Sequence, residues 1–476
     1  MFQQMAYKTI GMKYFLFLFF IFFTTVSFGQ DSYTLKFLPQ LQQSQWINSS
    51  NVTDAKVSIG LPVISSVSFY IFNSGFTYHD MFHRINDTSM GVDMGNLFSK
   101  LKKQNYVGFG TGISLFSINI AKNNVSCGFS ITDKMSFQFS YPGDLFNLLW
   151  YGNGAYLGKT LEIGNFGINA SWYREYALHG TYAYKKWTFG FSPKILFGKT
   201  NINTQETSVK LYTDPNFYNL TASANINVQT SGIPDTTDTK NGFLNGSNQV
   251  LSYVFNNQNR GLAMDLGAKY DISDKLNVSA GINDLGYIKW KSTVHNYKSG
   301  PSSFVFDGLH ADTYFQGDSS AISSQTLTDS ISKLVKFSKN SNAYTTYLPY
   351  SFFMMANYKL KHHWFGLQFN TQRFNKDFIY SGTLCYQLKL GKHFTGALTY
   401  TAKSYNPANI GGAIILQFAK MQWYIITDNW YAAVKPLDSK SVNLNLGMNL
   451  VFGNRIKKQK QNEAIDTEPI LTPVQQ

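Results

Sequence analysis

The amino-acid sequence predicts an all-β fold: an antiparallel transmembrane β-barrel of about 14 strands, within a range of about 12 to 16, with short helices in its loops. Three observations predict it. Only 14% of the 476 residues are charged and 16% are aromatic, whereas soluble domains are about 25% charged. The N-terminus has the pattern of an export signal, and apolar and polar residues alternate with period two along much of the chain.

Export is predicted from residues 1–29. Lys13 precedes an apolar run at 14–23, and small residues follow it as far as Gly29. This is the pattern of a secretory signal peptide cleaved between Gly29 and Gln30. An N-terminal membrane anchor is the alternative, although the apolar run is short for a bilayer. Downstream of the signal no apolar stretch of about 18 residues follows, so the exported chain is either soluble or a closed barrel.

The clearest strand covers residues 442–452. Its apolar side chains, Leu446 among them, fall on one face, and most of its polar ones, Asn445 among them, fall on the other, because successive strand side chains point to opposite sides. About eleven residues suffice for a tilted strand to cross a bilayer. A soluble sandwich would alternate as well, but the polar faces here are mostly Asn, Ser, Thr, Gln and Gly, and aromatic residues mark strand ends, as in membrane barrels. The same alternation recurs at residues 135–141, 220–229, 262–270 and 276–283.

The spacing of these patterns divides the chain after the signal into three parts. Residues 30–56 are an irregular N-terminal lead-in or plug, residues 57–453 are the barrel, and residues 454–476 are a disordered polar tail. Roughly 25 to 30 residues per strand with its connection give about 14 strands. Two stretches rich in Ser, Thr, Asn, Asp and Gly, 229–261 and 291–347, are predicted to be long extracellular loops, the second with a short amphipathic helix.

The net charge of +14 does not indicate nucleic-acid binding. Lysines occur singly or in pairs, as at Lys185 and Lys186 and at Lys389 and Lys392, and no dense basic cluster with interleaved aromatic residues is present in the sequence. We therefore expect solvated rims and contact with outer-membrane lipid, and no nucleic-acid partner.

Two groups of residues are candidates for a role inside the barrel or for redox chemistry. Asp265 and Lys269 share the predicted lumen face of one strand, about 13 Å apart at roughly 3.3 Å per residue. Each then needs a partner on a neighbouring strand or water, either as part of a structural ion-pair network or as a ligand contact. Cys127 belongs to an outward-facing set and Cys385 to an inward-facing set, so we expect no disulfide between them.

No catalytic or metal-binding motif stands out. His79 and His83 have the spacing of two ligands on one helical face, but no third ligand follows at a recognisable distance. The sequence has no Gly-x-Ser-x-Gly, Walker or His-Glu-x-x-His motif. We expect a protein that is not an enzyme, with no catalytic residues, no cofactor and no metal, although catalytic groups in barrels can come from separate strands.

Several ordered motifs stand out at residues 59–62, 73–76, 191–200, 261–270, 276–290, 427–430 and 446–453. Together they resemble an uncharacterised family of outer-membrane β-barrels of the Bacteroidota. That family is distantly similar to FadL-type channels for hydrophobic compounds and to PorP/SprF-like barrels associated with type IX secretion and gliding. The resemblance implies an outer-membrane barrel of a Gram-negative bacterium, and it implies no established activity.

These patterns leave two functions open. The first is a passive channel or transporter for a small solute, with hydrophobic compounds as the class that the FadL-like resemblance implies. The alternative is a membrane anchor or interaction partner without transport, for example of secretion or gliding machinery, with a periplasmic or surface protein as its partner. Whether residues 30–56 plug the lumen is the observation that separates them best.

Overall fold

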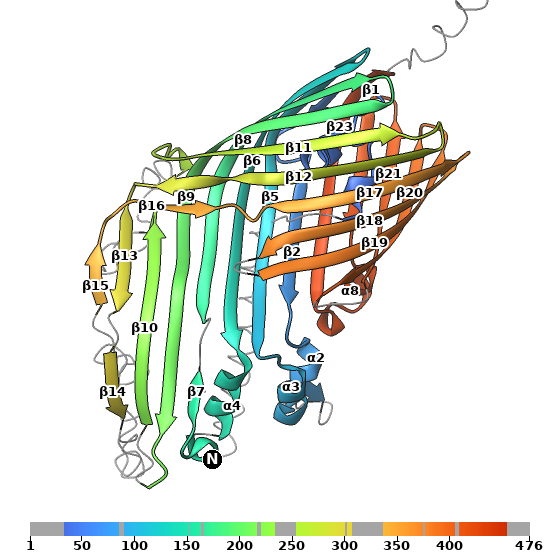
Figure 1. Ribbon diagram of the computed structural model, residues 1–476. Helices are drawn as coiled ribbons and strands as arrows, with labels where there is room; N and C mark the ends of the chain where they lie inside the picture. The colour runs from blue at the N-terminus through green and yellow to red at the C-terminus, as the bar shows by residue number, and fades with distance from the viewer. Residues whose placement is uncertain are drawn as a thin grey trace, which may run out of the picture.

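A computed structural model describes residues 33–84, 90–151, 153–162, 166–216, 220–233, 254–299, 302–306, 337–374, 377–404 and 409–454. The predicted signal, the helix expected within 291–347 and nearly all of the predicted tail lie outside these ranges. Within them, strands of one antiparallel sheet close into a ring (Figure 1).

The ring has fourteen positions, as the sequence predicts, because β1 and β2 share one position and β16 and β17 share another. Each strand pairs with the next, and β23 closes the ring on β1 and β2. In order around the ring, the strands are β1 (Ala55–Gly60), β2 (Val67–Asn73), β5 (Gln104–Lys122), β6 (Val125–Pro142), β8 (Gly167–Tyr184), β9 (Trp187–Thr213), β11 (Asn259–Asp271), β12 (Leu276–Trp290), β16 (Tyr344–Tyr347), β17 (Ser351–Leu360), β18 (His363–Phe374), β19 (Asp377–Leu390), β20 (Phe394–Lys403), β21 (Asn409–Phe418), β22 (Met421–Thr427) and β23 (Ser441–Asn454).

The two ends of the ring differ in their connections. At one end, here called the short-turn end, four hairpins close with two residues. The first of the two has a left-handed φ of 51 to 54°, as at Asn123 (φ 52°) and Lys185 (φ 51°). Such turns match the twist of paired strands. The other end, the long-connection end, carries the longer segments. In bacterial barrels short turns are periplasmic and long connections extracellular.

The long connections contain the short helices that the sequence predicts. In chain order, these connections hold α2 (Tyr78–Met81), β3 (Phe82–Arg84), β4 (Met90–Val92), α3 (Met94–Lys100), α4 (Gly143–Tyr151), η4 (Asn153–Tyr156), β7 (Thr160–Glu162), α8 (Trp430–Val434) and η5 (Pro436–Asp438).

The structure differs from the prediction in the second stretch expected to be a loop, 291–347, whereas most of the first, 229–261, lies outside the described residues. The far half of β9 pairs with β10 (Leu220–Ser231), which pairs with β13 (Val294–Ser299) and β14 (Ser302–Phe306), and β13 pairs with β15 (Phe337–Asn340). The physical reason is the length of β9. Its 27 residues exceed the roughly 9 to 11 that cross a bilayer, and the excess would leave backbone groups unpaired.

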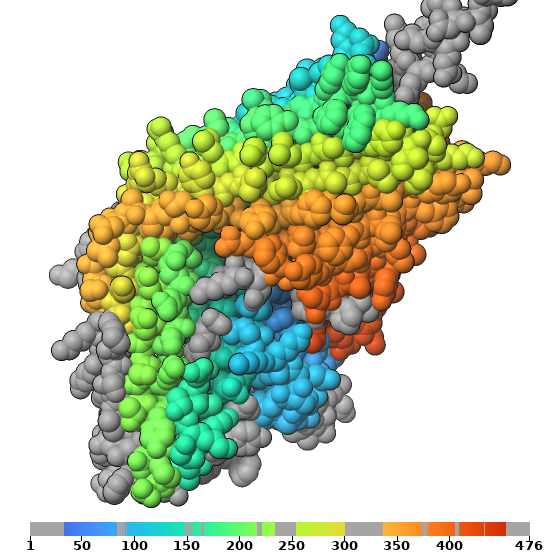
Figure 2. All heavy atoms as spheres, in the orientation of Figure 1, coloured from blue at the N-terminus to red at the C-terminus, as the bar shows by residue number. Residues whose placement is uncertain are grey.

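The added strands extend the wall beyond the ring on one side, below the closed barrel in Figure 1. The space-filling view shows the strands from β11 to β19 as a continuous wall, and β10 lies beyond the lower edge of this wall (Figure 2). Polar residues therefore form paired strands here, because cross-strand hydrogen bonds to β9 and β10 outweigh their weak strand propensity.

The outer face of the ring is apolar. The Leu446 side chain is 41% exposed, whereas Asn445, its neighbour on β23, is 8% exposed and faces inward, as the alternation predicts. Among the described helices, none combines the length and apolar character needed to cross a bilayer. Exposed apolar side chains of the outer face include Leu178, Phe189, Ile195, Leu266, Met354, Leu367, Leu384, Leu398 and Ile414.

We predict that Leu446→Arg impairs assembly of the barrel, because a charge on the lipid face near the middle of a bilayer costs about 2 to 4 kcal/mol. Leu446→Met, which keeps an apolar side chain of similar volume, serves as the control and should assemble normally. The measurement is heat-modifiable gel migration of protein refolded into lipid. Equal migration of both variants would show that Leu446 does not face lipid.

Candidate functional site in the lumen

The N-terminal segment, residues 33–53, lies inside the ring of strands and is called the plug below (blue in Figure 1). At the long-connection end, the backbone amide of Thr34 donates to Asp428 (2.9 Å), which follows β22. Near the short-turn end, the Asn119 side chain of β5 donates to the Thr53 hydroxyl (3.2 Å). The segment predicted as a lead-in or plug therefore runs through the lumen, with η2 (Leu35–Phe37) and η3 (Gln42–Trp46) along its path.

Apolar side chains of the plug pack on apolar patches of the inner wall. Leu38 and Leu41 are fully buried in one cluster with the inward-facing Ile426, and Phe37 packs with Phe353 in another. Burial of such a side chain stabilises by about 1.5 to 3 kcal/mol. The inner face of the barrel is therefore not uniformly polar. Its apolar patches lie where apolar side chains of the plug pack against the wall.

Polar side chains of the plug also find partners on the wall. The Gln43 amide donates to Asn449 Oδ1 on β23 (2.7 Å). The ammonium of Lys36, which is 1% exposed, donates to Asn370 Oδ1 on β18 (2.8 Å) and lies 4.9 Å from the centre of the Phe353 ring. Buried polar groups cost stability unless they are hydrogen-bonded, so these contacts fix the position of the plug.

One glycine of the wall is required for the plug to fit. A Cβ atom on Gly190 of β9 would collide with the backbone carbonyl of Ser49. The plug backbone therefore lies directly against the wall at this position. On the same strand, the Ser192 hydroxyl lies 3.4 Å from the Ser49 hydroxyl.

Five charged side chains from five neighbouring strands form a buried ion cluster beside the plug. The Lys194 ammonium lies 2.7 Å from an Asp265 oxygen, 2.6 Å from Asp284 and 3.6 Å from Glu175. The Lys134 ammonium lies 2.9 Å from Glu175 and 3.7 Å from Asp284. Lys194, Asp265 and Glu175 are at most 3% exposed, so in this cluster each charge depends on its neighbours.

A bulge in the sheet assembles the cluster. The register of β11 and β12 shifts between Met264 and Leu266, and Asp284 takes a left-handed φ of 56°, a conformation that Asp tolerates better than most residues. The Asp284 amide then donates to Asp265 Oδ1 (2.7 Å). As a result, Asp284 faces inward beside Asp265 instead of alternating outward.

The candidates from the sequence fall in different places. Asp265 is fully buried in the ion cluster, and Lys269 lies on the same face, opposite Thr188 and Ser279 in the register. Cys127 is exposed, Cys385 is buried, and both are free thiols.

The histidine pair does not share a helix. His79 lies on α2 and pairs with Asp438 of η5, whereas His83 lies in β3. The hydrogen bond with His79 holds the pKa of the Asp438 carboxyl below its usual range. In the described ranges, no group of three His, Cys, Asp or Glu side chains is placed to hold a metal ion.

One buried histidine, His179, is not among the candidates predicted from the sequence. Both ring nitrogens of His179 lie near hydroxyl groups, Ser130 at 2.9 Å and Ser192 at 3.1 Å, and Trp46 of the plug stacks on the ring with centroids 6.3 Å apart. His179 lies on the inward-facing side of the alternation in β8, next to outward-facing apolar positions. This alternation was the signal from which its inward position could be predicted. Its surroundings make it a contact between wall and plug.

The lumen holds two adjoining hollows on the side of the plug that faces the long-connection end. The vestibule, about 450 Å³, is lined by polar residues such as Asn169, Asn203 and Thr346. The inner cavity, about 120 Å³, lies below it. Both are lined by Ser136, Ser171 and Pro349, and the inner cavity is further lined by the plug residues Leu35, Gln43, Trp46 and Ile47 and by Lys134, Glu175, Asn283 and Asp284.

A third hollow, about 680 Å³, opens at the short-turn end. Its lining includes Lys389, Lys392 and Lys420 together with Asp54, the residue that follows the plug. Lys389 and Asp54 form an ion pair of 2.9 Å, with 35% and 69% of their side chains exposed. The plug therefore separates hollows that open toward opposite ends of the barrel.

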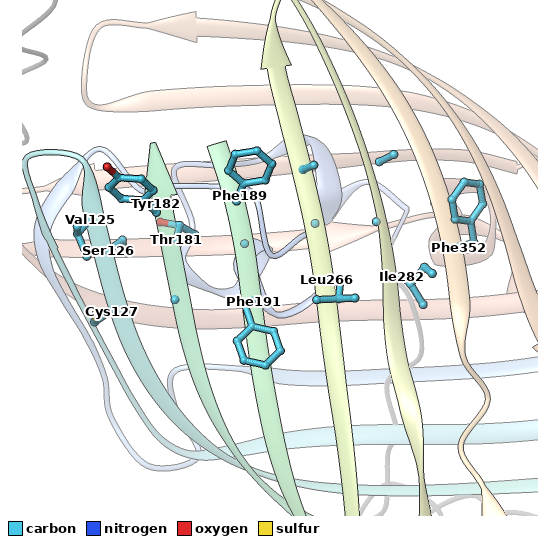
Figure 3. Close-up of a pocket in the computed structure, with 16 residues that line it drawn as sticks. Val125, Ser126, Cys127, Thr181, Tyr182, Phe189, Phe191, Leu266, Ile282 and Phe352 are labelled. Atoms are coloured by element: carbon cyan, nitrogen blue, oxygen red, sulfur yellow. The ribbon is translucent and has the colours of Figure 1, made fainter. Parts of the chain in front are cut away.

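The outer surface carries a separate apolar groove of about 710 Å³. Figure 3 shows Phe189 and Phe191 on one strand and Leu266, Ile282 and Phe352 on the strands beside it. Near the groove, the pairing of β8 with β9 is interrupted opposite Pro193, which has no N–H to donate.

A closed antiparallel ring with an apolar outer belt and a largely polar interior defines a transmembrane β-barrel, the class found in outer membranes. In this barrel a segment of the same chain fills the lumen. The chain belongs to the family described as "Family of unknown function (DUF5723)", whose model matches residues 50–428.

A comparison with curated proteins finds no match. Among solved structures, the chain is similar to the Pseudomonas putida toluene transporter TodX, at 10% identity and a TM-score of 0.38, over 90% of this chain and 98% of that one. It is also similar to the translocator domain of the autotransporter NalP from Neisseria meningitidis, at 6% identity and a TM-score of 0.31, over 83% and 89% of the two chains. Likeness at this level carries no information on what the barrel binds or moves.

We predict that Lys194→Met destabilises the barrel by about 3 to 5 kcal/mol, because it leaves buried carboxylates without their common partner. Lys389→Met removes an exposed ion pair and should change stability by about 1 kcal/mol or less. The measurement is the midpoint of urea unfolding in lipid vesicles. Equal midpoints for the two variants would show that the ion cluster is hydrated and contributes little to stability.

Proposed function

We propose that the protein is a passive outer-membrane channel for a small solute and that the plug closes it in the state described here. The observation that carries the proposal is the vestibule, which narrows into an inner cavity whose floor includes plug residues such as Trp46 and Ile47. Below the plug, the third hollow opens toward the periplasmic end. A displacement of the plug would join the two sides.

The plug is suited to being displaced, because it contributes no strand to the ring. Side-chain hydrogen bonds and apolar contacts hold it, such as Gln43 with Asn449 and Phe37 with Phe353. Hydrogen bonds of this kind contribute about 0.5 to 1.5 kcal/mol each. The ring can therefore stay paired while the plug moves. The proposal includes no catalytic step and no cofactor.

The lining of the lumen favours a solute that forms hydrogen bonds. The vestibule is lined by Ser, Thr, Asn and Gln side chains interspersed with apolar ones such as Phe72 and Leu348. The inner cavity adds the charged Lys134, Glu175 and Asp284. A hydrophobic solute, the class that the sequence resemblance implies, fits the apolar groove of the outer wall better than it fits the lumen. We propose the polar class for the route through the lumen.

The alternative function, binding of a protein partner, is supported by one feature. All four residues of β15 are exposed at the end of the added sheet, and an exposed strand can pair with another chain. This surface is compatible with transport, since it lies beyond the ring.

A disulfide between plug and wall tests the channel. The Ser49 and Ser192 hydroxyls are 3.4 Å apart, so a small side-chain rotation brings the two sulfurs of S49C/S192C within bonding distance, about 2.05 Å. Proteoliposomes with wild-type protein should take up a small polar solute such as glycine faster than empty liposomes. The oxidised double variant should lose this uptake at least tenfold, and a reductant should restore it.

The single variants S49C and S192C are the matched controls and should take up solute at the wild-type rate under oxidising conditions. Wild-type uptake no faster than that of empty liposomes would contradict the proposal. Uptake that the disulfide leaves unchanged would show that the plug is not the gate.

A further inference from the structure

The ion cluster beside the inner cavity carries one formal negative charge in excess. Its carboxylates are Glu175, Asp265 and Asp284, and its ammonium groups are Lys134 and Lys194. An uncompensated charge away from bulk water is costly. The cluster therefore favours a positively charged group in any space that it faces.

Only one side of the cluster faces the cavity. Lys194 and Asp265 have 1% and 0% of their side chains exposed and do not line the cavity. Asp284, with 26% of its side chain exposed, does line it. The Lys134–Asp284 distance of 3.7 Å is the longest in the cluster, so the Asp284 carboxylate has lone pairs available for a further donor.

A second acceptor beside Asp284 is without a donor. Asn283 lines the cavity and is 2% exposed, and its Oδ1 atom has no hydrogen-bond partner among the described residues. Its Nδ2 atom donates to the carbonyl of Ile47 in the plug (2.8 Å). This hydrogen bond sets the orientation of the amide group, so the atom without a partner is the oxygen. A buried acceptor of this kind costs about 1 to 3 kcal/mol until a donor reaches it.

The cavity also contains aromatic side chains suited to a cation. Trp46 of the plug and Tyr173 of β8 line the same space, and ring faces attract ammonium groups. Its volume of about 120 Å³ is several times the roughly 10 to 15 Å³ that a single water molecule needs. A compact organic molecule of a few heavy atoms fits, and a larger one requires the plug to move.

We propose that the inner cavity binds a small organic cation with a primary ammonium group. The ammonium donates to Asp284 and to Asn283 Oδ1, and its alkyl part packs against Trp46. This inference names the class of solute for the proposed channel and so rests on that function. A bare metal ion is a poorer occupant, because the carboxylates converge on lysine ammonium groups and no group of three ligands for a metal occurs in the described residues.

Isothermal titration of the full-length mature protein in detergent tests the inference. The probe is n-propylammonium chloride, with sodium propionate and 1-propanol as matched probes and potassium chloride as the control for simple cations. We expect saturable binding of n-propylammonium alone. Asp284→Asn should weaken it at least tenfold, whereas Asp54→Asn, which removes an exposed carboxylate at the short-turn end, should leave it unchanged.

Glu175→Gln is a second variant, because it also removes the excess charge on the cavity side, and it should weaken binding in the same direction. Retained heat-modifiable migration establishes that the variants are folded. Binding of propionate, equal heat from potassium chloride, absence of propylammonium binding by the folded wild type, or equal effects of Asp284→Asn and Asp54→Asn would each overturn the inference.

The titration needs no flux, which separates the two proposals. Propylammonium binding without plug-dependent uptake in proteoliposomes would retain the site and reject the channel. Plug-dependent uptake without propylammonium binding would retain the channel and reject the solute class.

Discussion

A ring of fourteen strands encloses more space than its own inward side chains can fill, since about eight strands is the size at which they suffice. The N-terminal segment fills much of this space. Its buried residues, from Thr34 to Thr53, account for features of the wall that a plain barrel would not need. Gly190 admits the backbone at Ser49, and the inward Ile426 and Phe353 are apolar because Leu38, Leu41 and Phe37 lie against them.

The parts of the fold that depend on local pattern could be predicted from the sequence. Alternation of side chains gave the facing of Leu446 and Asn445, and strand spacing gave the size of the ring. The strands within 291–347 escaped prediction, because polar segments became strands only through pairing with β9 and β10. A residue's partner across the sheet depends on register, which periodicity alone does not specify.

The ion cluster could be predicted only in part. Asp265 was identified as facing the lumen, but its four companions come from β6, β8, β9 and β12, and no local pattern links them. One signal was present. Apolar residues of β12 occupy even positions up to Ile282, and Leu285 and Tyr287 then occupy odd positions, which marks the bulge that turns Asp284 inward. The plug connects to this site through Asn283 and Ile47, so the closed state and the binding cavity depend on the same contacts.

The central claim is that residues 33–53 occupy the lumen in the closed protein, and hydrogen–deuterium exchange of the folded barrel in detergent tests it most directly. The amides of Ser44, Asn48 and Asn51 donate to carbonyls within the buried plug. They should therefore exchange far more slowly than the exposed turn at Lys361 and His362. Exchange of the plug amides within seconds, at the rate of that turn, would contradict a filled lumen.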